Sequence, residues 1–233
     1  MSPSFLCMFL TPWLFIAAKP ALSQELFFEV KGNYQRGVSL KKLKSARTMA
    51  DFCNGFPSNW ISNYVSSELS FIKDDKIVKS FGHNDTLTPD QRQMLQTVGL
   101  NTEIEFNITF MAENPVNHFV SARTMQLKMR VIPEKEAGFK EGYPKMSYYL
   151  YENAVRKITP SVPKSFQQVR VLFTVGEDGS VWDARLESTS GKPDTDQLIL
   201  DVIRAMPKWN PAEDQNGQPV KQEFELTIGS QGC

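Results

Sequence analysis

The sequence is poor in the residues that most enzymes and metal centres use. Only two histidines, His83 and His118, occur among its 233 residues, and no Cys-x-x-Cys motif is present. Neither histidine has the spacing of a metal ligand or of a nucleophile–base pair, so both are expected at the surface. Asp74, Asp75 and Asp178 stand in turn contexts, where carboxylates accept backbone hydrogen bonds. We therefore predict a protein that is not an enzyme, with no metal and no cofactor.

The chain also lacks an excess of charge of either sign. It contains 26 basic and 26 acidic residues, so no net field would draw it onto nucleic acid or an anionic membrane surface. Internal repeats and low-complexity tracts are absent as well. After removal of a targeting peptide roughly 210 residues would remain, enough for one or two small domains. We predict two.

No apolar run reaches the length of a membrane span. The run at residues 5–18 has 14 residues and is interrupted by Pro12, whereas a spanning helix needs about 20. Small residues occupy the −3 and −1 positions of a cut before Gln24, which predicts an export signal peptide at 1–23. Because residues 1–4 hold no Lys or Arg, a short uncleaved anchor is the alternative.

Three cysteines occur, and two would remain in the exported chain, Cys53 and Cys233. In an oxidising compartment they could close one large disulfide loop. The alternative is a buried, unpaired Cys53 and a Cys233 in a frayed C-terminus. The sequence leaves this pairing open.

Residues 24–133 are predicted to form a β-rich, sandwich-like domain with one short helix. Apolar and polar residues alternate over 101–110 and 127–131, the pattern of strands half buried against a core. Thr88 and Gln91 form a Thr-x-x-Gln capping box, and Gly99 is placed for a left-handed C-cap.

This region carries a family resemblance. The stretch VKSFGHNDTLTPDQRQMLQTVGLNTEIEFNITF has a strand ending in Ser-Phe, a Leu-Thr-x-x-Gln helix, a glycine and an alternating strand. In that order it resembles the repeated periplasmic domains of the gliding-motility protein GldM, over about 28–132. The resemblance implies a structural or docking domain.

Residues 134–142 are charged and contain two glycines, and we predict a linker there before a second domain at 143–233. In that domain Tyr143-Pro144 opens a helix through about Lys157, and a hairpin turns at 176–179. Asp194 or Thr195 is expected to cap a second helix that Pro207 ends. Trp182 and Trp209 are expected in the core, and a last strand follows Asn216-Gly217.

Several spaced motifs of this domain resemble the C-terminal domain of TonB-family energy transducers. They are Tyr143-Pro144, Asp178 to Val181, Met206 to Trp209, Pro211, Gly217 to Val220, and the alternating Phe224, Leu226 and Ile228. The resemblance implies a three-stranded antiparallel sheet with two helices, and hence an α+β fold class for the chain.

The resemblance implies a periplasmic protein that binds a TonB-dependent outer-membrane receptor segment by β-strand addition, in transmembrane transport. The implied contact residues are Tyr143, Pro144, Lys221, Gln222, Glu223, Phe224, Glu225, Leu226, Thr227 and Ile228. A membrane anchor and a Pro-rich spacer, typical of these transducers, are not evident, so coupling to inner-membrane motor proteins is doubtful. The alternative is a structural or adaptor subunit of a periplasmic assembly, such as gliding or secretion machinery.

Two of these site assignments have alternatives. Glu223 and Glu225 lie on the strand expected at the sheet edge, where charges also protect against unwanted pairing. Tyr143 and Pro144 could contact the partner or simply begin a helix, since proline suits the first helical turn. Open edge strands also allow a homodimer.

Overall fold

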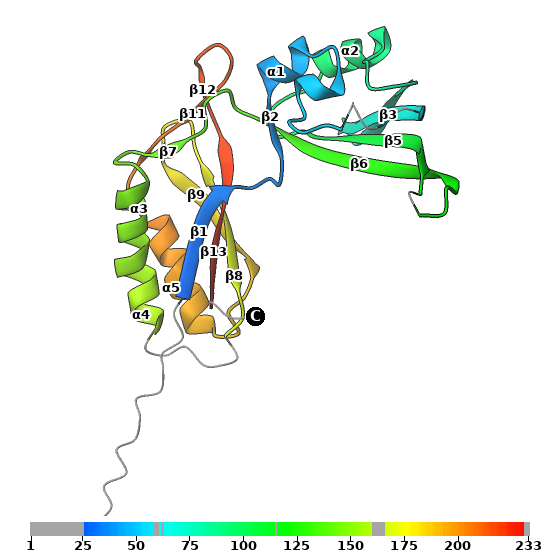
Figure 1. Ribbon diagram of the computed structural model, residues 1–233. Coiled ribbons are helices and arrows are strands. Elements are labelled where there is room, and N and C mark those ends of the chain that lie inside the picture. Colours follow the sequence, from blue (N-terminus) through cyan, green and yellow to red (C-terminus); the bar gives the residue numbers. More distant parts are fainter. Residues whose placement is uncertain (1–25, 58–60, 62, 115, 160–165, 231–233) are drawn as a thin grey trace, which may run out of the picture.

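The chain folds into two domains, each built around its own hydrophobic core, as the computed structural model shows (Figure 1). The structure describes residues 26–57, 61, 63–114, 116–159 and 166–230. The predicted signal peptide at 1–23 and Cys233 lie outside these residues. Within them, no helix combines the length and the apolar character needed to cross a membrane.

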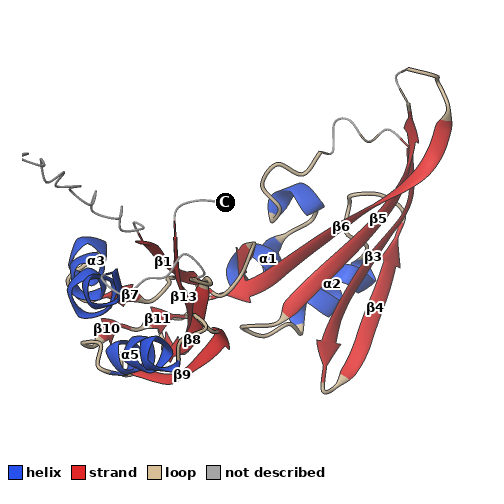
Figure 2. Cartoon of the chain, turned by 90° about the horizontal axis from the view of Figure 1, so that it is seen from below, coloured by secondary structure: helices blue, strands red, loops and turns tan. Residues whose placement is uncertain are grey.

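The first domain is a five-stranded sheet with two short α-helices against one face (Figure 2). The strand order is β2-β6-β5-β3-β4, with β2 parallel to β6 and all other pairs antiparallel. Its elements are β2 (Gly37–Ser39), α1 (Leu40–Ser45), the 3-10 turn η1 (Met49–Asp51), β3 (Asn63–Lys73), β4 (Lys76–Gly82), α2 (Pro89–Gln96), β5 (Glu103–Glu113) and β6 (Val120–Ile132).

The core of this domain lies between the sheet and its helices, so the mixed fold class is right but the sandwich is not. Ile104, Phe106 and Ile108 of β5 are fully buried and belong to one cluster with Leu43 of α1 and Leu95 of α2. The described residues contain one sheet here, and its buried face is covered by helices in place of a second sheet.

The predicted capping box is present at the start of α2. The Thr88 hydroxyl accepts from Gln91 N at 3.2 Å, and Gln91 Oε1 accepts from Thr88 N at 3.0 Å. The left-handed residue that follows the helix is Asn101 with φ 64°, and not Gly99. Asparagine tolerates this conformation because its short polar side chain can bond locally.

The second domain is a four-stranded antiparallel sheet in the order β1-β13-β8-β9, with helices packed on one face (Figures 1 and 2). The domain also contains two separate two-stranded ladders, β7 with β10 and β11 with β12. Its elements are β1 (Leu26–Gly32), β7 (Gly138–Phe139), α3 (Tyr143–Leu150), the π-helical turn η2 (Tyr151–Val155), α4 (Arg156–Ile158), β8 (Val169–Val175), β9 (Val181–Ser188), α5 (Pro193–Arg204), β10 (Trp209–Asn210), β11 (Ala212–Glu213), β12 (Pro219–Val220) and β13 (Gln222–Ser230).

The fourth strand of this sheet was not expected. β1 pairs antiparallel with β13 from Leu26 opposite Ser230 to Gly32 opposite Phe224. The predicted boundaries placed this segment in the first domain, and the predicted sheet had three strands. Both statements are wrong for β1, because its partner is about 200 positions away in sequence and no local pattern signals such a pairing.

Two local predictions for the second domain also need correction. α5 begins at Pro193, so neither Asp194 nor Thr195 is its N-cap, because proline is pre-organised for the first helical turn. Trp209 is buried as expected, but Trp182 is 43% exposed, and Lys221 Nζ lies 4.8 Å from its ring centroid. The Trp182 indole is thus a surface platform for a cation.

Candidate protein-interaction site

β13, the strand expected at the sheet edge, is an interior strand. It is hydrogen-bonded to β8 on one side and to β1 on the other. Among its predicted contact residues, Gln222, Phe224, Leu226, Thr227 and Ile228 are buried. The prediction that this strand is the exposed edge is therefore wrong, because β1 covers it.

The other predicted contact residues lie in three places. Tyr143 is 60% exposed and Pro144 is also exposed, both in the first turn of α3. Lys221 is exposed beside Trp182, whereas Glu223 and Glu225 are partly buried on the face of the sheet opposite the helices. The structure thus does not bring all predicted residues into one surface.

β1 is one free edge of the sheet, and its backbone polarity can be assigned. Asn33 N donates to Glu223 O at 3.0 Å, which continues the register of the ladder. Backbone groups of an antiparallel strand alternate in direction. The backbone N–H and C=O groups of Glu29 and Lys31 therefore point toward β13. Those of Phe28 and Val30 point away from the sheet.

The opposite edge, β9, is less regular. Its pairing with β8 is interrupted by two register shifts, and Asp183 has a left-handed φ of 53°. Ala184 O also accepts from Arg204 Nη2 at 3.3 Å. Such bulged edges are disfavoured as templates for another strand, so β1 is the better of the two.

An apolar pocket of about 230 Å³ lies beside β1 on the helix-bearing face. Its wall contains Val30 of β1, the first turns of α3, the short β7–β10 ladder and one β13 residue. The lining residues are Val30, Ala137, Gly138, Phe139, Gly142, Tyr143, Met146, Trp209 and Phe224. The pocket thus joins the free edge to Tyr143, one of the predicted contact residues.

Aromatic packing holds the floor of this pocket. The Trp209 ring centroid lies 5.0 Å from that of Phe224, 5.7 Å from Phe139 and 5.9 Å from Phe173. These distances are in the range of favourable aromatic pairs. The buried Trp209 Nε1–H has no hydrogen-bond partner among the described residues. The surface of the pocket is therefore mostly apolar.

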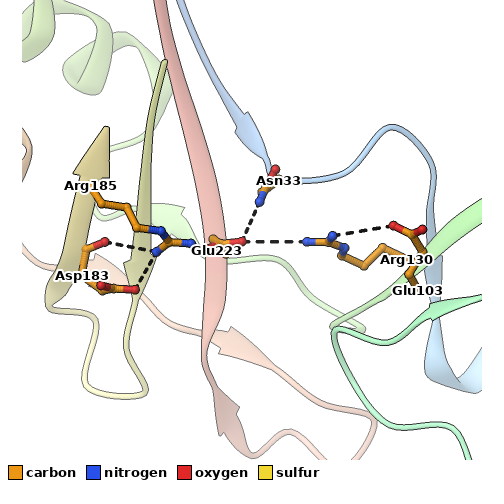
Figure 3. Close-up of polar contacts among 6 residues, drawn as sticks. All are labelled: Asn33, Glu103, Arg130, Asp183, Arg185 and Glu223. Carbon is orange, nitrogen blue, oxygen red and sulfur yellow. Dashed lines mark hydrogen bonds and ion pairs between the residues drawn. The ribbon is translucent and has the colours of Figure 1, made fainter. Parts of the chain in front are cut away.

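Glu223 of β13 ties β1 and β9 to the first domain (Figure 3). Its carboxylate accepts from Asn33 Nδ2 at 2.6 Å and from Arg185 Nη2 at 2.5 Å, and it lies 3.8 Å from Arg130 of β6. Arg130 in turn lies 3.9 Å from Glu103. One carboxylate thus contacts the residue that follows β1, the opposite edge strand β9 and the other domain.

We expect replacement of Glu223 by glutamine to destabilise the protein more at neutral pH than in acid. Burial alone would raise the pKa of Glu223, but hydrogen bonds from Asn33 and Arg185 and the charge of Arg130 hold it below its usual value. A folded pKa below the unfolded one stabilises the fold above the unfolded pKa. That contribution is lost as the pH falls through the folded pKa.

At about pH 7 we expect Glu223→Gln to lower the free energy of unfolding by about 1–2 kcal/mol, because charged hydrogen bonds are strong but this site is partly hydrated. Urea unfolding between about pH 3 and pH 7 measures it. Glu29→Gln, at an exposed residue of β1, is the control and should change stability by less than about 0.5 kcal/mol. An equal loss for Glu223→Gln at both ends of the pH range would contradict the ionic role.

The residues that sequence reasoning missed are those of β1 and the pocket wall. Leu26, Phe27 and Phe28 are consecutive apolar residues, with no clean alternation to mark the strand. Gly138 and Phe139 fall in the segment predicted to be a linker. The charges and glycines of this segment suggested a loop. It contains instead a two-residue strand that pairs with Trp209 and Asn210.

Comparisons with known proteins identify part of the domain that carries this site. Residues 167–229 match the family described as Gram-negative bacterial TonB protein C-terminal. The match includes β8, β9, α5 and β13, but it does not include β1. No match is found among curated proteins or among solved structures. The resemblance to TonB is thus confirmed, and residues 167–229 belong to the TonB C-terminal domain family.

Proposed function

We propose that this protein acts in the periplasm by binding an extended segment of an outer-membrane receptor, as part of TonB-dependent transport. The observation that carries the proposal is the TonB C-terminal domain, a protein-interaction domain that supports a role in receptor contact. A regular free strand edge in the same sheet fits recognition by strand addition. Tyr143 and Pro144 would contact the partner at this side of the domain.

Binding to receptor peptides tests this function directly. The probes are synthetic peptides of the periplasmic N-terminal segments of the source organism's TonB-dependent receptors, with scrambled peptides as controls. We expect saturable binding of at least one segment by calorimetry, at micromolar affinity or tighter. Failure of every receptor segment to bind above its scrambled control would overturn the proposal.

A second candidate function, a structural or adaptor subunit, is favoured by one observation in the first domain. The sheet-edge strand β4 exposes Ile77 (66%) and Phe81 (64%), and exposed apolar edge strands invite pairing with another chain. Crosslinking in cells from photoreactive residues placed in β4 and in β1 separates the candidates. Products with assembly subunits from β4, and none with receptors from β1, would favour the structural role.

A further inference from the structure

We propose that the receptor segment adds to the outer edge of β1, and that one apolar side chain of the segment enters the pocket between Val30 and Tyr143. This inference rests on the proposed function and deepens it, because it names the acceptor strand and the chemistry of the occupant. β13, the acceptor strand that the family resemblance implied, would then be the inner neighbour of the acceptor strand β1.

The backbone of β1 supplies the binding groups. Phe28 and Val30 direct their N–H and C=O groups away from β13, and no described strand pairs with that side. Unpaired strand groups of this kind are the basis of strand addition, in which main-chain hydrogen bonds supply affinity. The register of β1 with β13 is uninterrupted over its whole length, so the edge is straight enough to accept a partner.

The pocket supplies selectivity. Val30 lies in its wall, so a strand that added to β1 would bring alternate side chains over the same face as the pocket. At about 230 Å³ the pocket accommodates one side chain of leucine to phenylalanine size. The aromatic and aliphatic wall disfavours a charged occupant, because burial of an unpaired charge is costly. The occupant is therefore an extended peptide with an apolar residue at the position facing the pocket.

Gly138 allows the pocket to be narrowed with little disturbance of the fold. A Cβ built at Gly138 would meet no heavy atom within 4 Å, and its φ is not in the left-handed region. Gly99, in the first domain, has the same two properties and is the matched control. We expect Gly138→Leu to weaken the receptor peptide about tenfold to a hundredfold, the equivalent of one lost apolar burial. Gly99→Leu should leave affinity unchanged.

An engineered disulfide between β1 and β13 distinguishes a peptide that adds to β1 from a peptide that displaces β1. Lys31 lies opposite Glu225 in the ladder, on the face away from the helices. Opposed Cα atoms in such a pair are about 5.5 Å apart, within disulfide range. The double variant Lys31→Cys/Glu225→Cys locks β1 onto β13 when oxidised and releases it when reduced. We expect equal affinity of the full chain for the receptor peptide in the two states.

The outcomes distinguish this inference from the function on which it rests. If the wild-type chain binds no receptor peptide, the proposed function fails. If the wild type binds and the oxidised double variant does not, the peptide displaces β1 and the edge assignment is wrong. If the wild type binds and Gly138→Leu binds equally well, with an unchanged melting temperature, the pocket assignment is wrong. Self-association through β1 in sedimentation, with no peptide binding, would also overturn the inference.

Discussion

Replacing Gly179 by alanine is expected to destabilise the second domain by about 3–5 kcal/mol, from a left-handed conformation and severe overpacking. Gly179 has φ +79°, and a Cβ there would lie 2.0 Å from Trp209 O, a backbone atom. The two segments are also joined by the hydrogen bond from Trp209 N to Gly179 O at 2.8 Å. Relief of the clash would have to move Trp209, which packs in the aromatic floor of the pocket.

Gly217→Ala is the control for this prediction. Gly217 has a similar φ of +74°, but a Cβ there would meet nothing within 4 Å. We therefore expect Gly217→Ala to reduce stability only by the cost of placing alanine in a left-handed conformation, about 1–2 kcal/mol. Urea unfolding of both variants measures the difference. Equal losses in the two variants would show that the close approach to Trp209 is not important.

Removal of β1 is expected to have the second largest effect. A chain that begins at residue 34 should lose about 3–6 kcal/mol of stability in the second domain, relative to one that begins at residue 24. Leu26 is buried, and Phe28 and Val30 pack against the core, so their removal uncovers Leu226 and Ile228 of β13. The unpaired edge of β13 would also promote self-association.

Unfolding and sedimentation of the two chains measure both effects. The full chain carrying Glu29→Ser and Lys31→Ser is the control, because these side chains are exposed and their loss leaves the ladder with β13 intact. It should remain close to the wild type in stability and in sedimentation. If the shortened chain unfolds at the same urea concentration as the longer one, β1 contributes no stability to the sheet.

Many local features of both domains could be anticipated from the sequence pattern. The Thr88 capping box, the hairpin at Gly179 and the helix start at Tyr143 are signalled by residues within a few positions of one another. Such local signals work because caps and turns depend on backbone conformations that few residue types favour. The motifs of the TonB C-terminal domain were recognised for the same reason, since they lie in order along one segment.

The candidate site could not be anticipated in this way. Sequence reasoning selected Tyr143, which lines the pocket, and its neighbour Pro144, and it placed the acceptor edge on β13. The edge is β1, because strand order depends on which distant segment buries its apolar side chains against β13. Phe28 and Val30 satisfy that requirement, and nothing adjacent to either strand in sequence encodes the pairing.

The sequence by itself indicated the α+β class through local periodicity and turn chemistry. It also determined the family of residues 167–229, because the motifs that carry the resemblance lie in order along one segment. Only the tertiary structure decided which strand is free and where the apolar pocket lies. It also placed Glu223 between two domains, in contact with Arg185 and Arg130. These features arise from contacts between segments far apart in the chain, whose register and burial are settled only when the whole core packs.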